Sequence, residues 1–237
     1  MVAHRGASGH APENTLASFR RAVELGATFI ETDLQLSRDG RFVAIHDTTL
    51  DRTTSGRGPV SALKLSELRE LDAGSWFGPQ FASERIPSLD EILQFARESN
   101  TVFYLELKAR GAWGLLEHSL VGALRNASEA AQAVVISFDS GSLAALRRLE
   151  PTLMTGFLYD RACPDAVERA VSVGARQLAP RGDLVTRELV GEARRAGLQV
   201  VTWTINGSAQ MRALIAAGVD GIMSDYPDKL VALLREQ

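Results

Sequence analysis

The chain has 237 residues, 45% hydrophobic and 23% charged, a composition that supports a buried core in one large or two small domains and excludes a disordered chain. A net charge of −3 argues against a nucleic-acid-binding surface, and no apolar run approaches the ~20 residues that span a bilayer. The single cysteine, Cys163, excludes an intramolecular disulfide, and the first motif leaves no room for a signal peptide, so we expect a cytoplasmic protein without stable membrane association.

The first predicted strand is short and ends in two charged side chains. Residues 2–3 are apolar, and His4 and Arg5 follow them directly, before a glycine. The next segment, A-P-E-N-T, opens a helix, with Asn14 as its expected N-cap and Glu13 as an expected partner for Arg5. The sequence therefore predicts a buried strand that places charged side chains at its carboxyl end.

Two further apolar runs carry acidic and histidine side chains and are predicted to form a hairpin. The run TFIETDLQL places Glu31 and Asp33 one residue apart, so that both project from one face of a strand. About a dozen residues later His46 closes the run FVAIHD, an interval too short for a crossover with its own helix. The dipeptide Asp39-Gly40 between them predicts a two-residue turn. In that register Asp33 faces His46, and Glu31 projects from the same side.

Beyond residue 47 the chain passes from an irregular segment to a regular alternation. Residues 47–88 are rich in Thr, Gly and Pro, with one short helical stretch over 61–71, and predict an ordered insert. From residue 89 onward, apolar strands alternate with amphipathic helical segments, many of which begin at Ser, Thr or Asp and end at Gly. The predicted strands in this part cover residues 101–108, 133–139, 153–159, 175–180, 199–205 and 219–225.

The number of strands predicts the fold. Three N-terminal strands and six later ones make nine, one more than an eight-stranded barrel requires. We therefore predict an α/β fold with a single domain over residues 1–237, a (β/α)8 TIM barrel with one antiparallel hairpin strand and the insert, about residues 47–88, after the second strand. In the alternative, FVAIHD is itself a barrel strand and one later strand is peripheral.

Charged side chains gather where the predicted strands end, and in a TIM barrel the loops at the carboxyl ends build the site. Glu106 and Lys108, one residue apart, share a strand face. The carboxylates of Glu31, Asp33 and Glu106 would repel one another without a cation, and oxygen ligands suit Mg²⁺ or Ca²⁺. The alternative is a set of structural ion pairs with Arg5 and Lys108.

The remaining candidates suit chemistry on a phosphate ester. His4 and His46 could act as an acid and base pair near neutral pH, although a histidine at a strand end is commonly a structural hydrogen-bonding group. Arg5 and Lys108 could hold phosphate oxygens, or only neutralise the acids. Trp203, at the end of the eighth counted strand, could wall a substrate pocket or pack in the core.

Taken together, these motifs resemble the glycerophosphodiester phosphodiesterase family. The matching stretches run in the family's order from residue 2 to about 228: AHRGASGHAPENTLASF, FIETDLQLSRDG, FVAIHDTTLDRTTSGRG, IPSLDEIL, LELK, SFD, TWTIN and DGIMSDYPD. The resemblance implies a barrel of the phosphatidylinositol-phospholipase-C-like kind with a small insert after the second strand. It also implies hydrolysis of a glycerophosphodiester to sn-glycerol 3-phosphate and an alcohol.

The resemblance further implies a role for each candidate residue. The implied roles are acid and base for His4 and His46, ligands of a divalent metal (Mg²⁺, Ca²⁺ or Mn²⁺) for Glu31, Asp33 and Glu106, phosphate contacts for Arg5 and Lys108, and a substrate contact for Trp203.

Other functions remain open at this level. Lysophospholipase D-like or phospholipase-like hydrolysis of lipid phosphodiesters would need an apolar surface, for example from Trp76, Phe77 and Phe81. A non-catalytic phosphodiester-binding protein would not need two histidines, and a metal-dependent sugar isomerase would leave Arg5 and Lys108 unexplained. The sequence does not select the alcohol group of the substrate, the metal or the oligomeric state. It also does not decide whether water or the glycerol 2-hydroxyl is the nucleophile, or which histidine serves as the acid.

Overall fold

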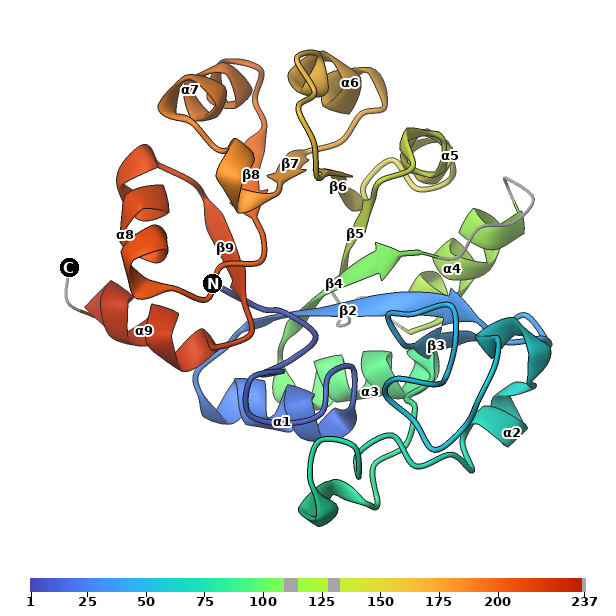
Figure 1. The fold of residues 1–237 in the computed structure, drawn as a ribbon. Coiled ribbons are helices and arrows are strands. Elements are labelled where there is room, and N and C mark those ends of the chain that lie inside the picture. Colours follow the sequence, from blue (N-terminus) through green and yellow to red (C-terminus); the bar gives the residue numbers. More distant parts are fainter. Residues whose placement is uncertain (109–114, 128–132, 236–237) are drawn as a thin grey trace.

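Eight parallel strands close into a barrel in the computed structural model, which describes residues 1–108, 115–127 and 133–235 (Figure 1). The barrel strands are β1 (Val2–Ala3), β2 (Phe29–Leu36), β4 (Val102–Leu107), β5 (Ala133–Ser137), β6 (Met154–Tyr159), β7 (Gln177–Pro180), β8 (Gln199–Thr202) and β9 (Gly221–Ser224). The short β1 closes the ring, because Val2 is paired with Phe29 of β2 on one side and with Met223 of β9 on the other. The predicted (β/α)8 barrel is confirmed.

Helices surround the strands, as the alternation in the sequence predicts (Figure 1). They are α1 (Leu16–Glu24), α3 (Leu89–Ser99), α4 (Leu115–Asn126), α5 (Ser140–Leu149), α6 (Ala166–Ser172), α7 (Arg187–Arg195), α8 (Ser208–Ala217) and α9 (Pro227–Arg235). In the described ranges, none of the helices is both long and apolar enough to cross a membrane.

Alternating side chains of each strand divide the core into two parts. On β4, Leu105 and Leu107 point outward and pack with Leu120 of α4, as predicted. Tyr104, which lies between Phe103 and Leu105 in the sequence, belongs instead to a separate cluster inside the barrel. Because the two faces of a strand alternate, the charged residues next to Leu105 and Leu107 are directed to the barrel interior, where they need partners.

The hairpin exists, but its register differs by one residue from the predicted one. The strand β3 (Phe42–Ala44) runs antiparallel to β2, with Leu36 opposite Phe42, and this pairing places Asp33 opposite Ile45 rather than His46. The Ser37 N–H donates to the Arg41 carbonyl, so the turn is a three-residue loop over 38–40.

The longer turn is stabilised by the conformation of Gly40 and by hydrogen bonds to Asp39, one of which comes from the insert. Gly40 occupies the left-handed region (φ +72°) at the last loop position, a recognised three-residue hairpin geometry. The Asp39 carboxylate accepts hydrogen bonds from the Ser37 hydroxyl and from the Leu65 backbone N–H. The prediction that Asp33 faces His46 in a two-residue turn was therefore wrong.

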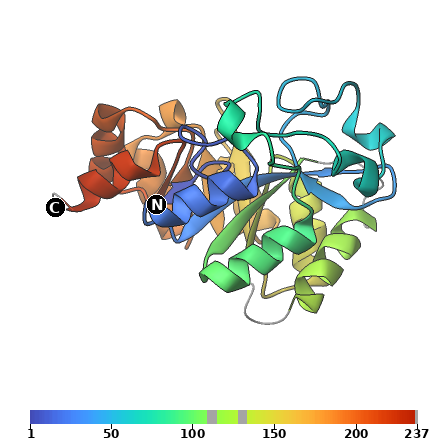
Figure 2. The same cartoon turned by 90° about the horizontal axis from the view of Figure 1, so that it is seen from below.

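The insert packs on the hairpin around a small apolar cluster of its own. Its helical elements are η1 (Val60–Ala62), α2 (Leu65–Leu68) and η2 (Pro79–Phe81), so the helical stretch predicted over 61–71 is shorter than expected. Buried side chains of the cluster come from both the hairpin strand and the insert, and they are Val43, Ile45, Leu50, Val60, Leu68, Ala73 and Ile86. Figure 2 shows the hairpin and the insert lying together at one side of the barrel.

Candidate active site

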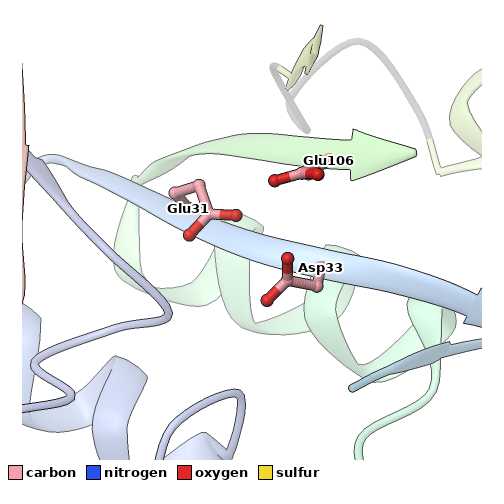
Figure 3. Close-up of side chains that lie close together, drawn as sticks. All are labelled: Glu31, Asp33 and Glu106. Carbon is pink, nitrogen blue, oxygen red and sulfur yellow. The ribbon is translucent and has the colours of Figure 1, made fainter. Parts of the chain in front are cut away.

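Three carboxyl groups converge on neighbouring strands of the barrel. Glu31 and Asp33 lie on β2, and Glu106 of β4 is the direct register partner of Asp33. Figure 3 shows the three side chains gathered beside these two strands. One oxygen from each carboxyl group lies within 4.8 Å of the others, so the structure brings together the predicted acidic set.

Burial makes this cluster electrostatically costly without a cation. Glu31 and Asp33 are each only 1% exposed. Burial, followed by the neighbouring charge of Asp33, raises the pKa of Glu31 to about 8, and the same causes raise the pKa of Glu106. For Asp33, burial is outweighed by Arg5 and Lys108, which hold its pKa below the usual range.

Two oxygens of the cluster lack a hydrogen-bond donor. Among the residues that the structure describes, Glu31 Oε1 and Asp33 Oδ1 are buried without a hydrogen bond. Asp33 Oδ1 lies 3.4 Å from Lys108 Nζ, an ion pair without hydrogen-bond geometry. Because buried polar atoms are normally hydrogen-bonded, carboxylate oxygens without a hydrogen bond fit a hard divalent cation. The donor set is therefore suitable for a metal.

Asn14 holds Asp33 and is not the helix N-cap. Its side-chain amide donates to Asp33 Oδ2 (2.8 Å), while its carbonyl oxygen accepts from Thr32 Oγ1 (2.7 Å) and from the Asp33 N–H (3.2 Å). Thr15 caps α1 through a capping box with Ser18. The predicted cap was wrong by one residue, because Asn14 adopts φ +57° and turns its side chain toward β2.

Arg5 contacts the acidic cluster through both its backbone and its side chain. The Arg5 N–H donates to Glu31 Oε2 (2.9 Å), and its Nε lies 3.2 Å from Asp33 Oδ2. Nη1 donates to Glu13 Oε1 (2.8 Å), so the predicted Glu13 partnership is confirmed.

Lys108 Nζ donates to Glu106 Oε1 (2.9 Å) and lies 3.4 Å from Asp33 Oδ1. Both cations therefore border the carboxylates, next to the candidate metal position.

His4 is oriented by a residue from the other end of the chain. Its Nδ1 lies 2.7 Å from Asp225 Oδ1, and its Nε2 lies 3.9 Å from Glu31 Oε2. Asp225 also accepts from Ser8 and Asn206. Burial alone would lower the pKa of His4, but the hydrogen bond to Asp225 and the charge of Glu31 raise it. Sequence reasoning missed Asp225, although the matched stretch DGIMSDYPD contains it.

His46 has a similar support from its neighbour in sequence. Its Nδ1 lies 2.6 Å from Asp47 Oδ1. Burial, together with the positive charges of Arg5 and Lys108, lowers the pKa of His46 although Asp33 opposes this shift. Arg52 donates in turn to Asp47. The two histidines thus differ in the direction of their pKa shifts, and sequence reasoning missed both Asp47 and Arg52.

Trp203 lies at the carboxyl end of the barrel, directly after β8. Its indole N–H donates to the Ala179 carbonyl (2.8 Å), and its ring packs against the barrel-interior cluster. Phe138, which follows β5 and is 43% exposed, meets Trp203 edge to face at 5.6 Å between ring centroids. The aromatic pair therefore caps the barrel on the face where its strands end.

The chemistry of the site is that of a barrel enzyme acting on an anionic ester. A buried acidic cluster fit for a divalent cation lies beside two cations and a histidine, and a second histidine interacts with Asp33 through its charge. Hard cations and basic side chains together favour phosphate oxygens, and two histidines can move protons.

Comparison with known proteins agrees with this class. Residues 4–229 match the model of the Glycerophosphoryl diester phosphodiesterase family. A glycerophosphodiester phosphodiesterase of Caldanaerobacter subterraneus subsp. tengcongensis is 38% identical over 237 residues, covering 100% of this chain and 98% of the relative. The chain belongs to the glycerophosphoryl diester phosphodiesterase family and is a phosphoric diester hydrolase.

Solved structures support the same assignment. An Oleispira antarctica phosphodiesterase, solved in complex with the product sn-glycerol-3-phosphate, superimposes with a TM-score of 0.94 at 32% identity, covering 99% of this chain and 96% of that one. The glycerophosphodiester phosphodiesterase of Agrobacterium tumefaciens strain C58 superimposes with a TM-score of 0.85 at 30% identity, covering 98% of each chain.

Proposed function

We propose that the enzyme hydrolyses glycerophosphodiesters to sn-glycerol 3-phosphate and an alcohol, with a divalent metal and with His4 and His46 as acid and base. The observation that carries this proposal is the pair of histidines, each held through Nδ1 by its own aspartate. His4 approaches Glu31, and His46 interacts with Asp33 through its charge, so both act around one acidic cluster. A protein that only binds phosphodiesters has no need of two such oriented groups.

The carboxylates of Glu31, Asp33 and Glu106 are the proposed metal ligands. Glu31 Oε1 and Asp33 Oδ1, which are buried without a hydrogen bond, support this assignment. When bound, a divalent cation such as Mg²⁺, Ca²⁺ or Mn²⁺ supplies positive charge that stabilises the phosphate oxygens as negative charge develops. Asn14 keeps Asp33 in place by its three hydrogen bonds to β2.

The cationic side chains are proposed to bind the phosphate group. Arg5 presents a planar fork and Lys108 a point charge, and both border the acidic cluster. Trp203 is proposed to line the substrate pocket at the end of β8. The cytoplasm is the proposed compartment, in keeping with the single cysteine, Cys163.

The opposite pKa shifts support a division of labour between the histidines. His46, whose pKa is lowered by burial and by nearby cations, is the proposed base that accepts a proton from the nucleophile. His4, whose pKa is raised by its hydrogen bond to Asp225 against the effect of burial, is the proposed acid that donates to the leaving alkoxide. The nucleophile is either water or the glycerol 2-hydroxyl. A substrate with the 2-hydroxyl removed separates these routes, because only direct attack by water would still cleave it.

The test is an assay of glycerol 3-phosphate release from choline, ethanolamine, glycerol and inositol esters of glycerol 3-phosphate, with lysophospholipids in parallel. We expect release from at least one water-soluble ester, loss of activity with EDTA, and recovery with Mg²⁺, Mn²⁺ or Ca²⁺. Hydrolysis of lysophospholipids alone would favour the lipid-hydrolase alternative. Activity that persists after exhaustive dialysis against EDTA would contradict the three-carboxylate metal site.

A further inference from the structure

Arg52, in the insert, connects the surroundings of His46 to those of Arg5. Its guanidinium donates through Nε (2.7 Å) and Nη2 (3.1 Å) to the two oxygens of Asp47. It also donates through Nη1 and Nη2, both at 2.8 Å, to the two oxygens of Glu13. One guanidinium group therefore donates hydrogen bonds to both oxygens of each of two carboxylates, a bidentate geometry that requires the planar arrangement of its N–H donors.

Each of the two carboxylates has a second partner in the site. Asp47 Oδ1 lies 2.6 Å from His46 Nδ1, and Glu13 Oε1 accepts from Arg5 Nη1 at 2.8 Å. Arg5 in turn has its Nε 3.2 Å from Asp33 Oδ2. A continuous chain of charged contacts thus runs from His46 through Arg52 to the acidic cluster.

The insert fixes the position of Arg52 in the fold. Leu50, two residues before it, is fully buried in the apolar cluster that joins the insert to β3. The Leu50 N–H donates to the Gly58 carbonyl, and Thr49 forms a bridge with Pro59, so both sides of this loop are tied together. Thr53 is also buried. The backbone around Arg52 is therefore held by packing independent of its own ion pairs.

We propose that Arg52 is a positioning residue that holds His46, through Asp47, and Arg5, through Glu13, in the geometry needed for the reaction. The proposal rests on the proposed function, since it takes His46 as an acid–base group and Arg5 as a phosphate contact. The side chain of Arg52 is 45% exposed, and exposed ion pairs contribute little to stability. We therefore expect its removal to change the orientation of Asp47 and Glu13 more than the overall stability.

The contact of Arg52 with Asp47 and its contact with Glu13 are expected to affect different kinetic constants. Asp47 fixes which nitrogen of His46 carries the proton, so Asp47→Asn is expected to lower kcat. Glu13 orients Arg5, which binds the phosphate already in the bound substrate, so Glu13→Gln is expected to raise KM. Arg52→Gln removes the support of both and is expected to lower kcat and raise KM, with kcat/KM falling about 10–100-fold, the range known for residues that orient metal ligands from behind.

The experiment measures kcat and KM for Arg52→Gln and Arg52→Lys, with melting temperatures, on an ester that the wild type cleaves. The matched control is Arg38→Gln, since Arg38 also ties the hairpin to the insert through an exposed pair with Glu67. We expect the control to behave as the wild type. Arg52→Lys retains the charge without the fork and is expected to be nearly as impaired as Arg52→Gln, so it serves if Arg52→Gln does not fold.

A double-mutant cycle with Asp47→Asn separates positioning from a general loss of structure. If Arg52 acts on kcat through Asp47, the double variant has about the kcat of Asp47→Asn alone, whereas independent effects multiply. Multiplying losses, wild-type kinetics in Arg52→Gln, or wild-type kinetics in Arg52→Lys would each overturn the proposal. An inactive wild type would instead refute the proposed function, so the two failures are distinguishable.

Discussion

Each proposed catalytic histidine is held through Nδ1 by an aspartate, and the other ring nitrogen, Nε2, is the one proposed to meet the substrate; in His4 it lies 3.4 Å from the Thr204 hydroxyl oxygen. For His4 the aspartate is Asp225, whose pKa is lowered to about 2 by hydrogen bonds from His4, Asn206 and Ser8, although burial opposes this shift. For His46 it is Asp47, whose pKa is lowered by Arg52 and then by His46. Carboxylates that stay ionised over the working pH range keep both rings in one orientation.

Replacing either histidine tests this assignment directly. His4→Ala and His46→Ala are each expected to lower kcat about 10²–10⁴-fold, the usual contribution of a general acid or base. His118→Ala is the control, since His118 is exposed on α4 and the sequence assigns it no part in the site. Turnover above half the wild-type value in either site variant, measured as glycerol 3-phosphate release, would refute the role of that histidine.

The loop between β1 and α1 is the element that brings His4 and Arg5 to the site. Arg5 and Gly6 both adopt the left-handed region, with φ of +53° and +79°. This bend directs the Arg5 N–H to Glu31. It also brings Gly6 so close to α1 that a Cβ there would lie 2.4 Å from the Ser18 hydroxyl oxygen. Only glycine meets both the conformational and the steric requirement.

Gly6→Ala is therefore expected to weaken both stability and activity. The strained conformation should cost about 1–3 kcal/mol in the free energy of unfolding, measured by urea denaturation, and displacement of Arg5 should lower kcat/KM. Gly122→Ala in α4 provides a contrast of opposite sign. A Cβ there has nothing within 4 Å, so alanine is expected to stabilise the helix by about 0.5–1 kcal/mol. Equal stability of the two variants would contradict the argument.

At the scale of the whole molecule, the barrel buries ionisable groups, so the free energy of unfolding depends on pH. The pKa of Glu31 is raised from 4.5 to about 8, so between these values the folded, metal-free protein holds a proton that the unfolded chain has lost. The free energy of unfolding must then fall as the pH rises through this window. The raised pKa values of Glu106 and His4 act in the same direction, while the lowered pKa of His46 opposes it.

The metal-free enzyme is therefore expected to melt at a lower temperature at pH 8 than at pH 5. Glu31→Gln removes the titrating group, so its melting temperature should depend less on pH in EDTA. At one fixed concentration, added Mg²⁺ or Mn²⁺ should stabilise the wild type most at pH 8, where Glu31 gives up its proton to bind the metal, and should stabilise the variant much less; a concentration of 100 times the Kd at that pH stabilises by about 2.7 kcal/mol. Differential scanning calorimetry of both proteins checks this. Identical slopes against pH in EDTA would show that Glu31 does not titrate in this window.

The strands, the helices and the candidate residues follow from local patterns in the sequence. Apolar runs of strand length alternate with amphipathic segments, and each pattern depends on neighbours only a few residues apart. The one-residue spacings of Glu31 with Asp33 and of Glu106 with Lys108 determine shared strand faces in the same way. For this reason the barrel and the acidic cluster were predictable without coordinates.

Contacts between distant segments were decided only by the tertiary structure. The partner of His4, Asp225, lies 221 residues away and reaches it because β1 pairs with β9 when the barrel closes. The role of Asn14 depends on a left-handed backbone angle, and the hairpin register depends on bonds of Asp39 with the insert. Side-chain partners of this kind are selected by the closed fold as a whole, so no short pattern in the sequence contains them.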